Sequence, residues 1–229
     1  MTAFVLGATG FVGREVVRQL CVRGAKVIAH VRPDSSSLAT WQARFDELGA
    51  TVDTTAWDVP AMTATIERLA PDHVYILIGT TRHKARSEHV DGNIYEKVDL
   101  GLTRIAVAAA KASGRSPRIV YLSGIGASSN ARGAYMKARG QAEDVVRDSC
   151  LPWVIAQPAI ITGDRDDSRF GERSAAVIGD GLLAVARVFG GKTLRDRYRS
   201  TTSDILAAAL IRIAEGPDID RVFAGAELR

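Results

Sequence analysis

The stretch AYMKARG at 134–140 places one tyrosine close to two cations. Lys137 follows Tyr135 by two residues, and Arg139 follows it by four. A tyrosine, whose unperturbed pKa is about 10, can exchange a proton with a carbonyl or alcohol oxygen when a nearby positive charge moves that pKa toward working pH. Residues four apart share one face of a helix, and residues two apart do not. If this stretch begins a helix, Arg139 lies beside Tyr135, and Lys137 lies on the surface.

A second stretch with chemical potential is LGATGFVG, where a short apolar run meets an amphipathic segment. Its glycines allow the backbone to approach a pyrophosphate closely, and the amino end of the following helix favours the negative charge. The glycine spacing is GxxGxxG instead of the usual GxGxxG of dinucleotide-binding turns. The alternative is a tight turn without a ligand. We expect a dinucleotide here, with contacts from Gly7, Thr9, Gly10, Phe11, Val12 and Gly13.

An arginine follows the second apolar run, in AHVRPD, about 20 residues after the glycine turn, as the spacing rule for dinucleotide sites expects. A carboxylate at this place takes the ribose 2′-OH of NAD, whereas a cation takes the 2′-phosphate of NADP. Arg32 can grip a phosphate with two parallel hydrogen bonds, and Asp34 lies nearby, beyond a proline. NADP is therefore the expected cofactor and NAD the less favoured one, with a solvated loop arginine as the alternative.

Two further stretches lie at the expected carboxyl ends of strands, where ligands bind in parallel sheets. WDVP contains Asp58, which could accept a hydrogen bond from an adenine amine, and Val59. IGTT contains Gly79, Thr80 and Thr81, and the glycine leaves room for backbone beside a cofactor. We include all five residues among the expected cofactor contacts.

Short apolar runs alternate with amphipathic segments along most of the chain. Such alternation is typical of a parallel sheet with helices on both faces, and right-handed crossovers then favour a doubly wound order. We expect an α/β fold: one Rossmann-like domain over 1–229, with a mostly parallel sheet and a small C-terminal elaboration. Strands are expected at 3–6, 26–31, 51–55, 73–79, 118–124, 153–158 and 221–228. Helices are expected at 11–23, 38–48, 61–69, 93–113, 134–148, 174–188 and 201–216.

The composition limits the classes of partner and site. The 229 residues carry 30 basic and 26 acidic side chains, a small and scattered excess that argues against nucleic acid. No apolar run approaches the length of a membrane span and no leader precedes the first strand, so we expect a cytoplasmic protein. Cys21 and Cys150 are expected as small buried hydrophobes, not as a disulfide. His83 and His89 lack companion ligands, so no metal site is expected.

Several motifs occur in the order that is typical of one known superfamily. GATGFVG, VRP, YLSGIGA, the helix-opening Tyr135 and QPAIITGDRDDSRFGER resemble the atypical short-chain dehydrogenases/reductases. The set GTTR, VD, YLS and GDRDDSRFGE is more similar still to the group that contains the human Tat-interacting protein and its bacterial relatives. The resemblance covers nearly the whole chain, and it implies a Rossmann-like fold and NAD(P) binding.

The resemblance also implies a catalytic set of serine, tyrosine and lysine. Carried over, the serine is Ser123 at the end of a strand, and the tyrosine is Tyr135. The position of the lysine, four residues after the tyrosine, holds Arg139 instead. An arginine can stabilise a tyrosinate or bond a ribose hydroxyl, but it cannot release a proton to a relay. The resemblance further implies that Pro158 and Ala159 lie near the nicotinamide.

Two functions from different classes remain open at this point. The first is an NADP-dependent oxidoreductase that transfers a hydride to or from a small carbonyl or alcohol. The second is a non-catalytic NADP-binding regulatory or assembly protein with a protein partner, which the arginine at the lysine position favours. A homodimer is compatible with both. The loops 79–89 and 163–173 fit either a ligand-binding role or solvated surface.

Overall fold

The computed structural model describes residues 1–79, 94–159, 161–162 and 201–229. A seven-stranded sheet has the order β3-β2-β1-β4-β5-β6-β9, and every pair of neighbouring strands in it is parallel. The strand order reverses between β1 and β4, as in a doubly wound sheet, so the expected fold class is confirmed. The strands are β1 (Thr2–Leu6), β2 (Lys26–His30), β3 (Thr51–Asp53), β4 (His73–Ile76), β5 (Arg118–Leu122), β6 (Trp153–Gln157) and β9 (Arg221–Ala224).

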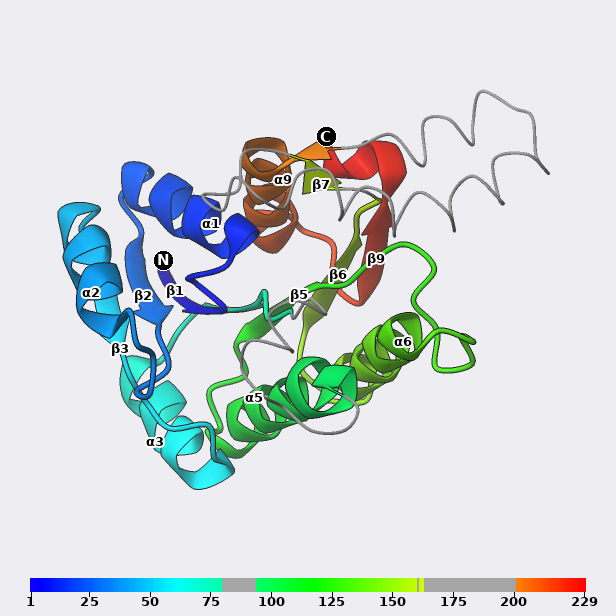
Figure 1. Ribbon diagram of the computed structural model, residues 1–229, viewed down its shortest axis with the longest axis horizontal. Coiled ribbons are helices and arrows are strands. Elements are labelled where there is room, and N and C mark those ends of the chain that lie inside the picture. The colour runs from blue at the N-terminus through cyan, green and yellow to red at the C-terminus, as the bar shows by residue number, and fades with distance from the viewer. Residues whose placement is uncertain (80–93, 160, 163–200) are drawn as a thin grey trace.

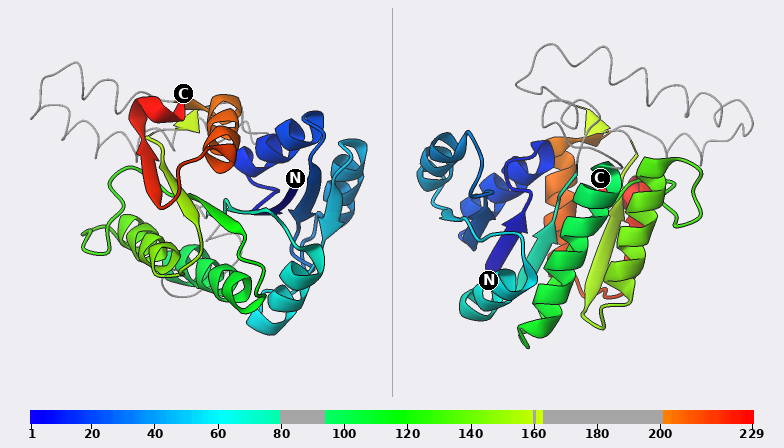
Figure 2. Two further views of the ribbon diagram at one scale, coloured as in Figure 1. Left: turned by 180° about the vertical axis from the view of Figure 1, so that it is seen from behind. Right: turned by 60° about the horizontal axis from the view of Figure 1, so that its bottom comes forward.

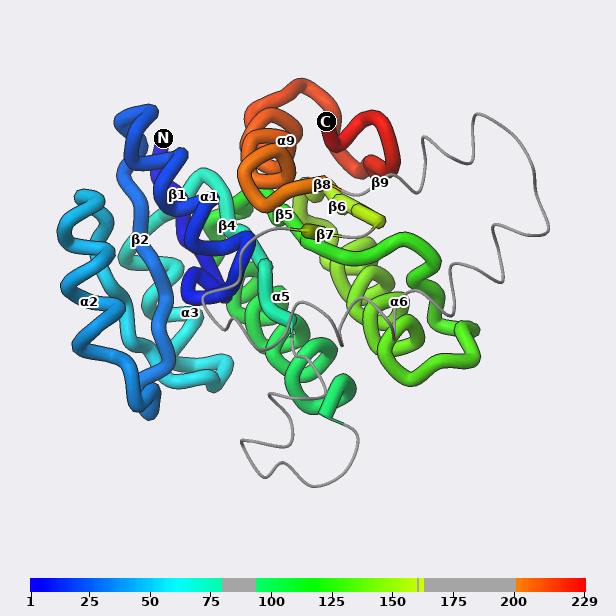
Figure 3. The backbone as a smooth tube through the Cα atoms, turned by 45° about the horizontal axis from the view of Figure 1, so that its top comes forward, coloured from blue at the N-terminus to red at the C-terminus, as the bar shows by residue number. Residues whose placement is uncertain are grey.

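Helices cover both faces of this sheet (Figure 1). One face is covered by α1 (Phe11–Val22), α2 (Leu38–Glu47) and α9 (Ser203–Glu215). The other face is covered by α3 (Val59–Leu69), α5 (Leu102–Ala112) and α6 (Ala134–Arg147). Figures 2 and 3 show α5 and α6 side by side, with α9 next to α1 across the sheet. Because all seven strands are parallel, their carboxyl ends lie at one edge of the sheet. The sequence patterns predict the site at this edge.

Two apolar cores follow from this layering. Alternate residues of a strand point to opposite faces, so Ala3 and Val5 of β1 join the core under α1 and α9, while Phe4 and Leu6 join the core under α3, α5 and α6. Strands that are buried on both faces need continuous apolar runs. This requirement explains why these strands were recognisable in the sequence.

The expected helix at 93–113 is confirmed, but its first turns are not α-helical. Residues Tyr95–Gly101 form a π-helix, labelled η1, and α5 starts only at Leu102. A π-helix has a wider turn, which changes the side chains that share its inner face. Asp99 and Leu100 of this π-helix are both buried. The segment therefore brings a carboxylate into the interior of the protein.

Other expected elements agree more closely. The helix α3 begins at Val59, earlier than expected, and the late strand is confirmed as β9, which joins the main sheet beside β6. A short 3-10 helix, η2 (Gly225–Leu228), follows it, and β7 (Ile161–Thr162) pairs with β8 (Thr201–Thr202). The expected helix at 174–188 lies outside the described residues. Across the part of the chain that the structure describes, no helix is both long and apolar enough to cross a membrane.

The two cysteines are free thiols in different settings. Cys21 is half-buried on α1, and burial raises the pKa of its thiol. Cys150 is exposed, so the expectation of burial is wrong for this residue. It has a φ of +61° in the turn after α6, which carries its side chain away from the core.

Gly140 on α6 offers a test of the packing against the loop before this helix. A Cβ on Gly140 would collide with the backbone of Ser128 and Ser129. Alanine is the better helix former by about 1 kcal/mol, but overpacking against backbone costs about 1–3 kcal/mol or more. We therefore expect Gly140→Ala to lower the free energy of unfolding by about 2 kcal/mol, measured by urea denaturation. Gly133→Ala is the control, since a Cβ there meets open space, and an equal effect of both variants would contradict the packing argument.

Candidate functional site

The turn between β1 and α1 depends on two glycines where a side chain would not fit. Gly7 has a φ of +85°, a left-handed conformation that favours glycine, and a Cβ on it would lie 2.8 Å from the carbonyl oxygen of Leu77. A Cβ on Gly13, in the first turn of α1, would collide with the carbonyl oxygen of Gly7. The helix therefore starts pressed against the turn, and the turn lies against the segment that follows β4.

Gly10 leaves the amino end of α1 open. It is the N-cap residue of this helix, it is exposed, and it places no side chain over the first turn. The first N–H groups of a helix lack intrahelical partners and attract anions. Thr9 and Phe11 are half-buried beside this opening, whereas the side chain of Val12 lies in the core. Val12 can therefore offer a ligand its backbone N–H but no side-chain contact.

Arg32 lies just after β2, at the same edge of the sheet, and is exposed. Its Nε lies 3.7 Å from Oδ1 of Asp34, and the two side chains are 44% and 75% exposed. An exposed ion pair of this kind contributes little to stability. Arg32 can therefore exchange this partner for a more strongly charged anion at small cost, and its contact with a 2′-phosphate stays a prediction.

Asp58 begins a helix. Its Oδ1 accepts a hydrogen bond from the N–H of Ala61 at 2.9 Å, which makes it the N-cap of α3. Val59 is the first residue of that helix and is half-buried. The cap accounts for an aspartate at this position without a ligand. The contacts of both residues with an adenine ring stay predictions.

A buried cluster surrounds Arg139, which is 5% exposed. Its Nη2 lies 3.0 Å from Oδ1 of Asp99, and its Nη1 donates to the carbonyl oxygen of Leu122 at 2.7 Å. The same Nη1 donates to the hydroxyl of Tyr121 at 3.4 Å. Asp99 belongs to η1, and Tyr121 and Leu122 end β5. The guanidinium therefore ties the π-helix and a central strand to α6.

Tyr135 lies between a cation and a second aromatic ring. The guanidinium carbon of Arg139 is 5.4 Å from the centre of the Tyr135 ring. Tyr95 meets the same ring edge-on, with ring centres 5.2 Å apart. Lys137 is exposed. The structure thus confirms the expected geometry, in which Arg139 is the cation beside the tyrosine and Lys137 lies on the surface; the catalytic roles stay predictions.

The groups around Arg139 keep its guanidinium positively charged. Burial works to lower the pKa of the guanidinium, but Tyr121, Tyr135 and Asp99 outweigh it and raise this pKa above its ordinary value. Burial also raises the pKa of the Tyr121 hydroxyl. A permanently charged arginine balances the carboxylate of Asp99, and it cannot pass on a proton.

Gly79 follows β4 and lies over the buried guanidinium. It is exposed, and a Cβ on it would lie 2.5 Å from Nη2 of Arg139. The absence of a side chain lets the backbone pass directly across the cluster. The neighbouring Thr80 and Thr81 lie outside the described residues, as do the rest of the 79–89 loop and the 163–173 loop.

Ser123 follows β5 and is 5% exposed. Its hydroxyl donates a hydrogen bond to Oε1 of Glu143 at 2.5 Å. Pro158, which follows β6, is buried, and its carbonyl oxygen accepts a hydrogen bond from the N–H of Ile125 at 2.9 Å. Ala159 is half-buried. The segments after β5 and β6 therefore run together at the edge of the sheet, as the expected nicotinamide side of the site requires.

Three side chains of this site were not predicted from the sequence: Tyr95, Asp99 and Glu143. Glu143 lies four residues after Arg139 on α6, and this spacing was a usable signal for a shared helix face. Tyr95 and Asp99 lie on the π-helix, where the usual helical spacing does not apply. Their contacts with Tyr135 and with the guanidinium are tertiary, so the sequence carried no local signal for them.

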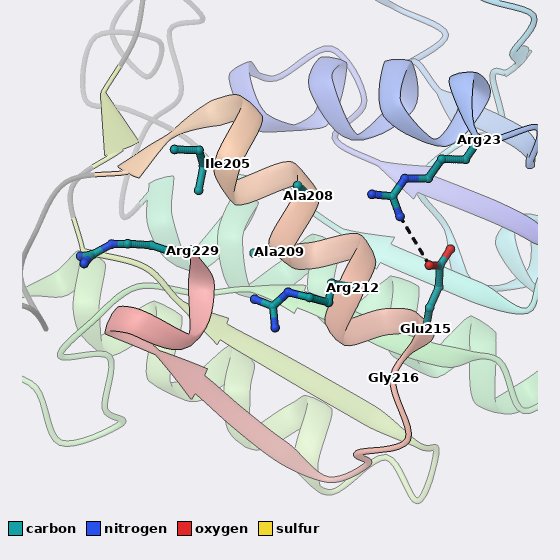
Figure 4. Close-up of a pocket in the computed structure, with 8 residues that line it drawn as sticks. All are labelled: Arg23, Ile205, Ala208, Ala209, Arg212, Glu215, Gly216 and Arg229. Carbon is teal, nitrogen blue, oxygen red and sulfur yellow. Dashed lines mark ion pairs between the residues drawn. The ribbon is translucent and has the colours of Figure 1, made fainter.

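Two surface depressions lie away from this edge. One of about 650 Å³ is bordered by α9, the end of α1 and the C-terminal turn, with Arg23 paired to Glu215 at 3.5 Å (Figure 4). Another of similar size lies at the amino ends of strands, beside His73 and Arg118. Neither is lined by a residue of the expected site. Within the described ranges, no group of three or more His, Cys, Asp or Glu side chains is arranged to hold a metal.

The pairing of Arg139 with Asp99 can be tested through stability. Arg139→Met should lower the free energy of unfolding by about 3–5 kcal/mol, because it leaves the buried carboxylate of Asp99 without this cation. Lys137→Met, on the exposed side of the same helix, should change it by less than about 0.5 kcal/mol. The double variant Asp99→Asn with Arg139→Met should recover part of the loss, measured by urea denaturation. Simple addition of the two single losses would show that the two charges are not coupled.

Sequence comparisons with known proteins find a family and several relatives of this chain. Residues 7–182 match a family described as NAD(P)H-binding. The mitochondrial protein FMP52 of Candida albicans is 28% identical over 186 residues, which cover 79% of this chain and 76% of the yeast protein. The mitochondrial FMP52 of Lodderomyces elongisporus is 31% identical over 183 residues, which cover 76% of this chain and 73% of that protein.

A solved structure provides an independent comparison of the fold. The UDP-glucose 4-epimerase of Thermotoga maritima, determined with UDP-glucose, has a TM-score of 0.66 and 19% identity over 97% of this chain and 76% of its own. At this identity the likeness concerns the fold alone. The narrower resemblance to the group of the Tat-interacting protein stays a prediction, because these curated relatives are FMP52 proteins. The family match and these relatives show that the chain belongs to the NAD(P)H-binding family of Rossmann-like proteins.

Proposed function

We propose that the chain is an NADP(H)-dependent oxidoreductase that transfers a hydride to or from a small carbonyl or alcohol. One observation carries the proposal: the open amino end of α1, Gly79 and the Tyr135–Arg139 pair lie at the carboxyl edge of one parallel sheet. Dinucleotides bind at this edge, near the reversal of strand order. The match to an NAD(P)H-binding family supports the class of cofactor.

The residues at this edge fit a dinucleotide. Gly10 places no side chain over the amino end of α1, and the N–H groups there would hold a pyrophosphate. Arg32, at the end of β2, supplies a positive charge for a 2′-phosphate, which supports NADP over NAD. A bound nicotinamide ring would supply the hydride or take it up. Pro158 and Ala159 then border the nicotinamide, while Asp58 and Val59 border the adenine.

The reacting end of the site is built on α6 and β5. In this proposal Tyr135 exchanges a proton with the substrate oxygen, and Ser123 orients that oxygen. Arg139 contacts the Tyr135 ring through a cation–π interaction, and Asp99 balances its charge. In this proposal Arg139 is a positioning residue, because its donors are directed to groups inside the protein.

A second function is favoured by one observation. The family's lysine position holds an arginine whose donors are directed to Asp99, Leu122 and Tyr121, as expected for a structural cation. A non-catalytic NADP(H)-binding regulatory or assembly protein would need no proton carrier there. The names of the curated relatives state no activity, and they describe those proteins as mitochondrial. The expected cytoplasmic location of this chain stays a prediction.

The proposed preference for NADP can be tested at Arg32. Arg32→Glu should weaken NADPH binding about 10- to 100-fold, because a charge-assisted contact is worth about 1.5–3 kcal/mol. NADH binding should change little, since NADH has no 2′-phosphate. Fluorescence titration with each cofactor gives both affinities. Lys111→Glu makes the same charge change at the carboxyl end of α5 and serves as the control; an equal loss for both cofactors would refute the role of Arg32.

The proposed chemistry can be tested at Tyr135. Tyr135→Phe should lower kcat by about 10²- to 10⁴-fold and leave the Kd of NADPH unchanged, because it removes an acid and not a cofactor contact. The assay follows the absorbance of NADPH with a panel of quinones, aldehydes and ketones. Tyr95→Phe keeps the ring that packs against Tyr135 and is the matched control. Wild-type protein that binds NADPH and consumes it with no member of the panel would favour the regulatory function.

A further inference from the structure

Glu143 is a buried carboxylate to which the proposed function gives no role. It is 1% exposed and lies one helical turn beyond Arg139 on α6. Three donors reach it: the Ser123 hydroxyl at 2.5 Å, the Gln157 amide at 2.8 Å and Nη2 of Arg147 at 2.6 Å. Burying a carboxylate is costly unless it is both paired and hydrogen-bonded. This set of donors meets both conditions at the end of β5.

The hydrogen bond between Ser123 and Glu143 decides what Ser123 offers to a substrate. A serine hydroxyl has one hydrogen and two lone pairs, and an ionised carboxylate can only accept. The hydrogen of Ser123 therefore points to Glu143, and lone pairs of its oxygen are left for the site. A substrate hydroxyl can donate to those lone pairs. A carbonyl oxygen needs a donor, which Ser123 becomes only when Glu143 carries a proton.

Because residue 139 is an arginine, the hydrogen bond between Ser123 and Glu143 matters for where the proton of the reaction goes. Oxidation of an alcohol releases a hydride and a proton, and under the proposed function the cofactor takes the hydride. Tyr135 can take this proton only if its own phenol proton moves on, and Arg139 cannot receive that proton because it stays charged. Glu143 is a carboxylate in direct contact with Ser123. Its partner Arg147 is 36% exposed, so this carboxylate is paired with a side chain that reaches the surface.

We propose that Ser123 and Glu143 form the proton relay of this site, an inference that rests on the proposed function. In alcohol oxidation Tyr135 takes the proton of the substrate hydroxyl and gives its own phenol proton to Oγ of Ser123, while the hydrogen of Ser123 moves to the carboxylate of Glu143. The electron pair of the C–H bond leaves as the hydride that NADP⁺ takes. The products are a carbonyl, NADPH and a protonated Glu143, and carbonyl reduction reverses each transfer.

The first experiment requires no turnover. Infrared difference spectra recorded as the pH is lowered should contain the band of a protonated carboxyl group that Glu143→Gln lacks. Ser123→Ala should shift this band, because it removes a hydrogen bond to that carboxyl group. Ser149→Ala is the control, since the Ser149 hydroxyl donates to the carbonyl oxygen of Val146. A band that Ser123→Ala leaves unchanged would overturn the relay.

The second experiment measures kinetics with a substrate found in the panel. Ser123→Ala and Glu143→Gln should each lower kcat about 10²- to 10³-fold and leave the KM for the cofactor within about twofold. The double variant should be no slower than the slower single variant, because both changes remove the same relay. Losses that multiply would show two independent roles and would overturn the proposal.

The two proposals fail in different ways. Turnover by the wild-type protein without an infrared response to Ser123→Ala would leave the oxidoreductase function standing and overturn the relay. An infrared response together with no turnover of any member of the panel would confirm the bond between Ser123 and Glu143, favour the regulatory function and overturn the use of this bond as a relay.

Discussion

Burial of the Arg139 guanidinium is the constraint on which the site depends. A charge so far from water costs several kcal/mol unless it is paired and well hydrogen-bonded. The chain offsets this penalty with Asp99 from the π-helix and with the Leu122 carbonyl oxygen from β5. Because these partners belong to different elements, satisfying one charge fixes η1, β5 and α6 relative to one another. The ring of Tyr135 rests against the guanidinium and takes its position from this arrangement.

The same helix carries a second charge cluster one turn further on. Arg139 is paired with Asp99 of another segment, and Glu143 is paired with Arg147 of its own helix. Each buried charge of α6 is therefore balanced locally, and together the two pairs add no net charge to this edge of the sheet. Attraction for an anionic cofactor must come from elsewhere at the edge. Among the described residues, the amino end of α1 and the side chain of Arg32 bring positive charge to this edge.

Features that depend on local patterns could be predicted from the sequence. Glycine spacing placed the β1–α1 turn, apolar runs placed the strands, and a four-residue spacing placed Arg139 beside Tyr135. The partner of this arginine could not be predicted, because Asp99 lies far earlier in the chain and on a π-helix that breaks the usual spacing. The depth at which Arg139 is buried is also a tertiary property. The local sequence around a helical arginine is the same whether that side of the helix is exposed to water or packed against a strand.

The geometry also shows why Arg139 is not a simple exchange for a lysine. A guanidinium presents donors in a rigid planar fork, so it can reach Asp99 with one nitrogen and Leu122 with the other. A lysine has a single ammonium group and could not span these partners in the same way. The fork also needs space, which the chain provides at Gly79, where a Cβ would come within 2.5 Å of Nη2. Arg139, Asp99 and Gly79 thus form one structural unit, whose guanidinium stays charged and cannot carry a proton.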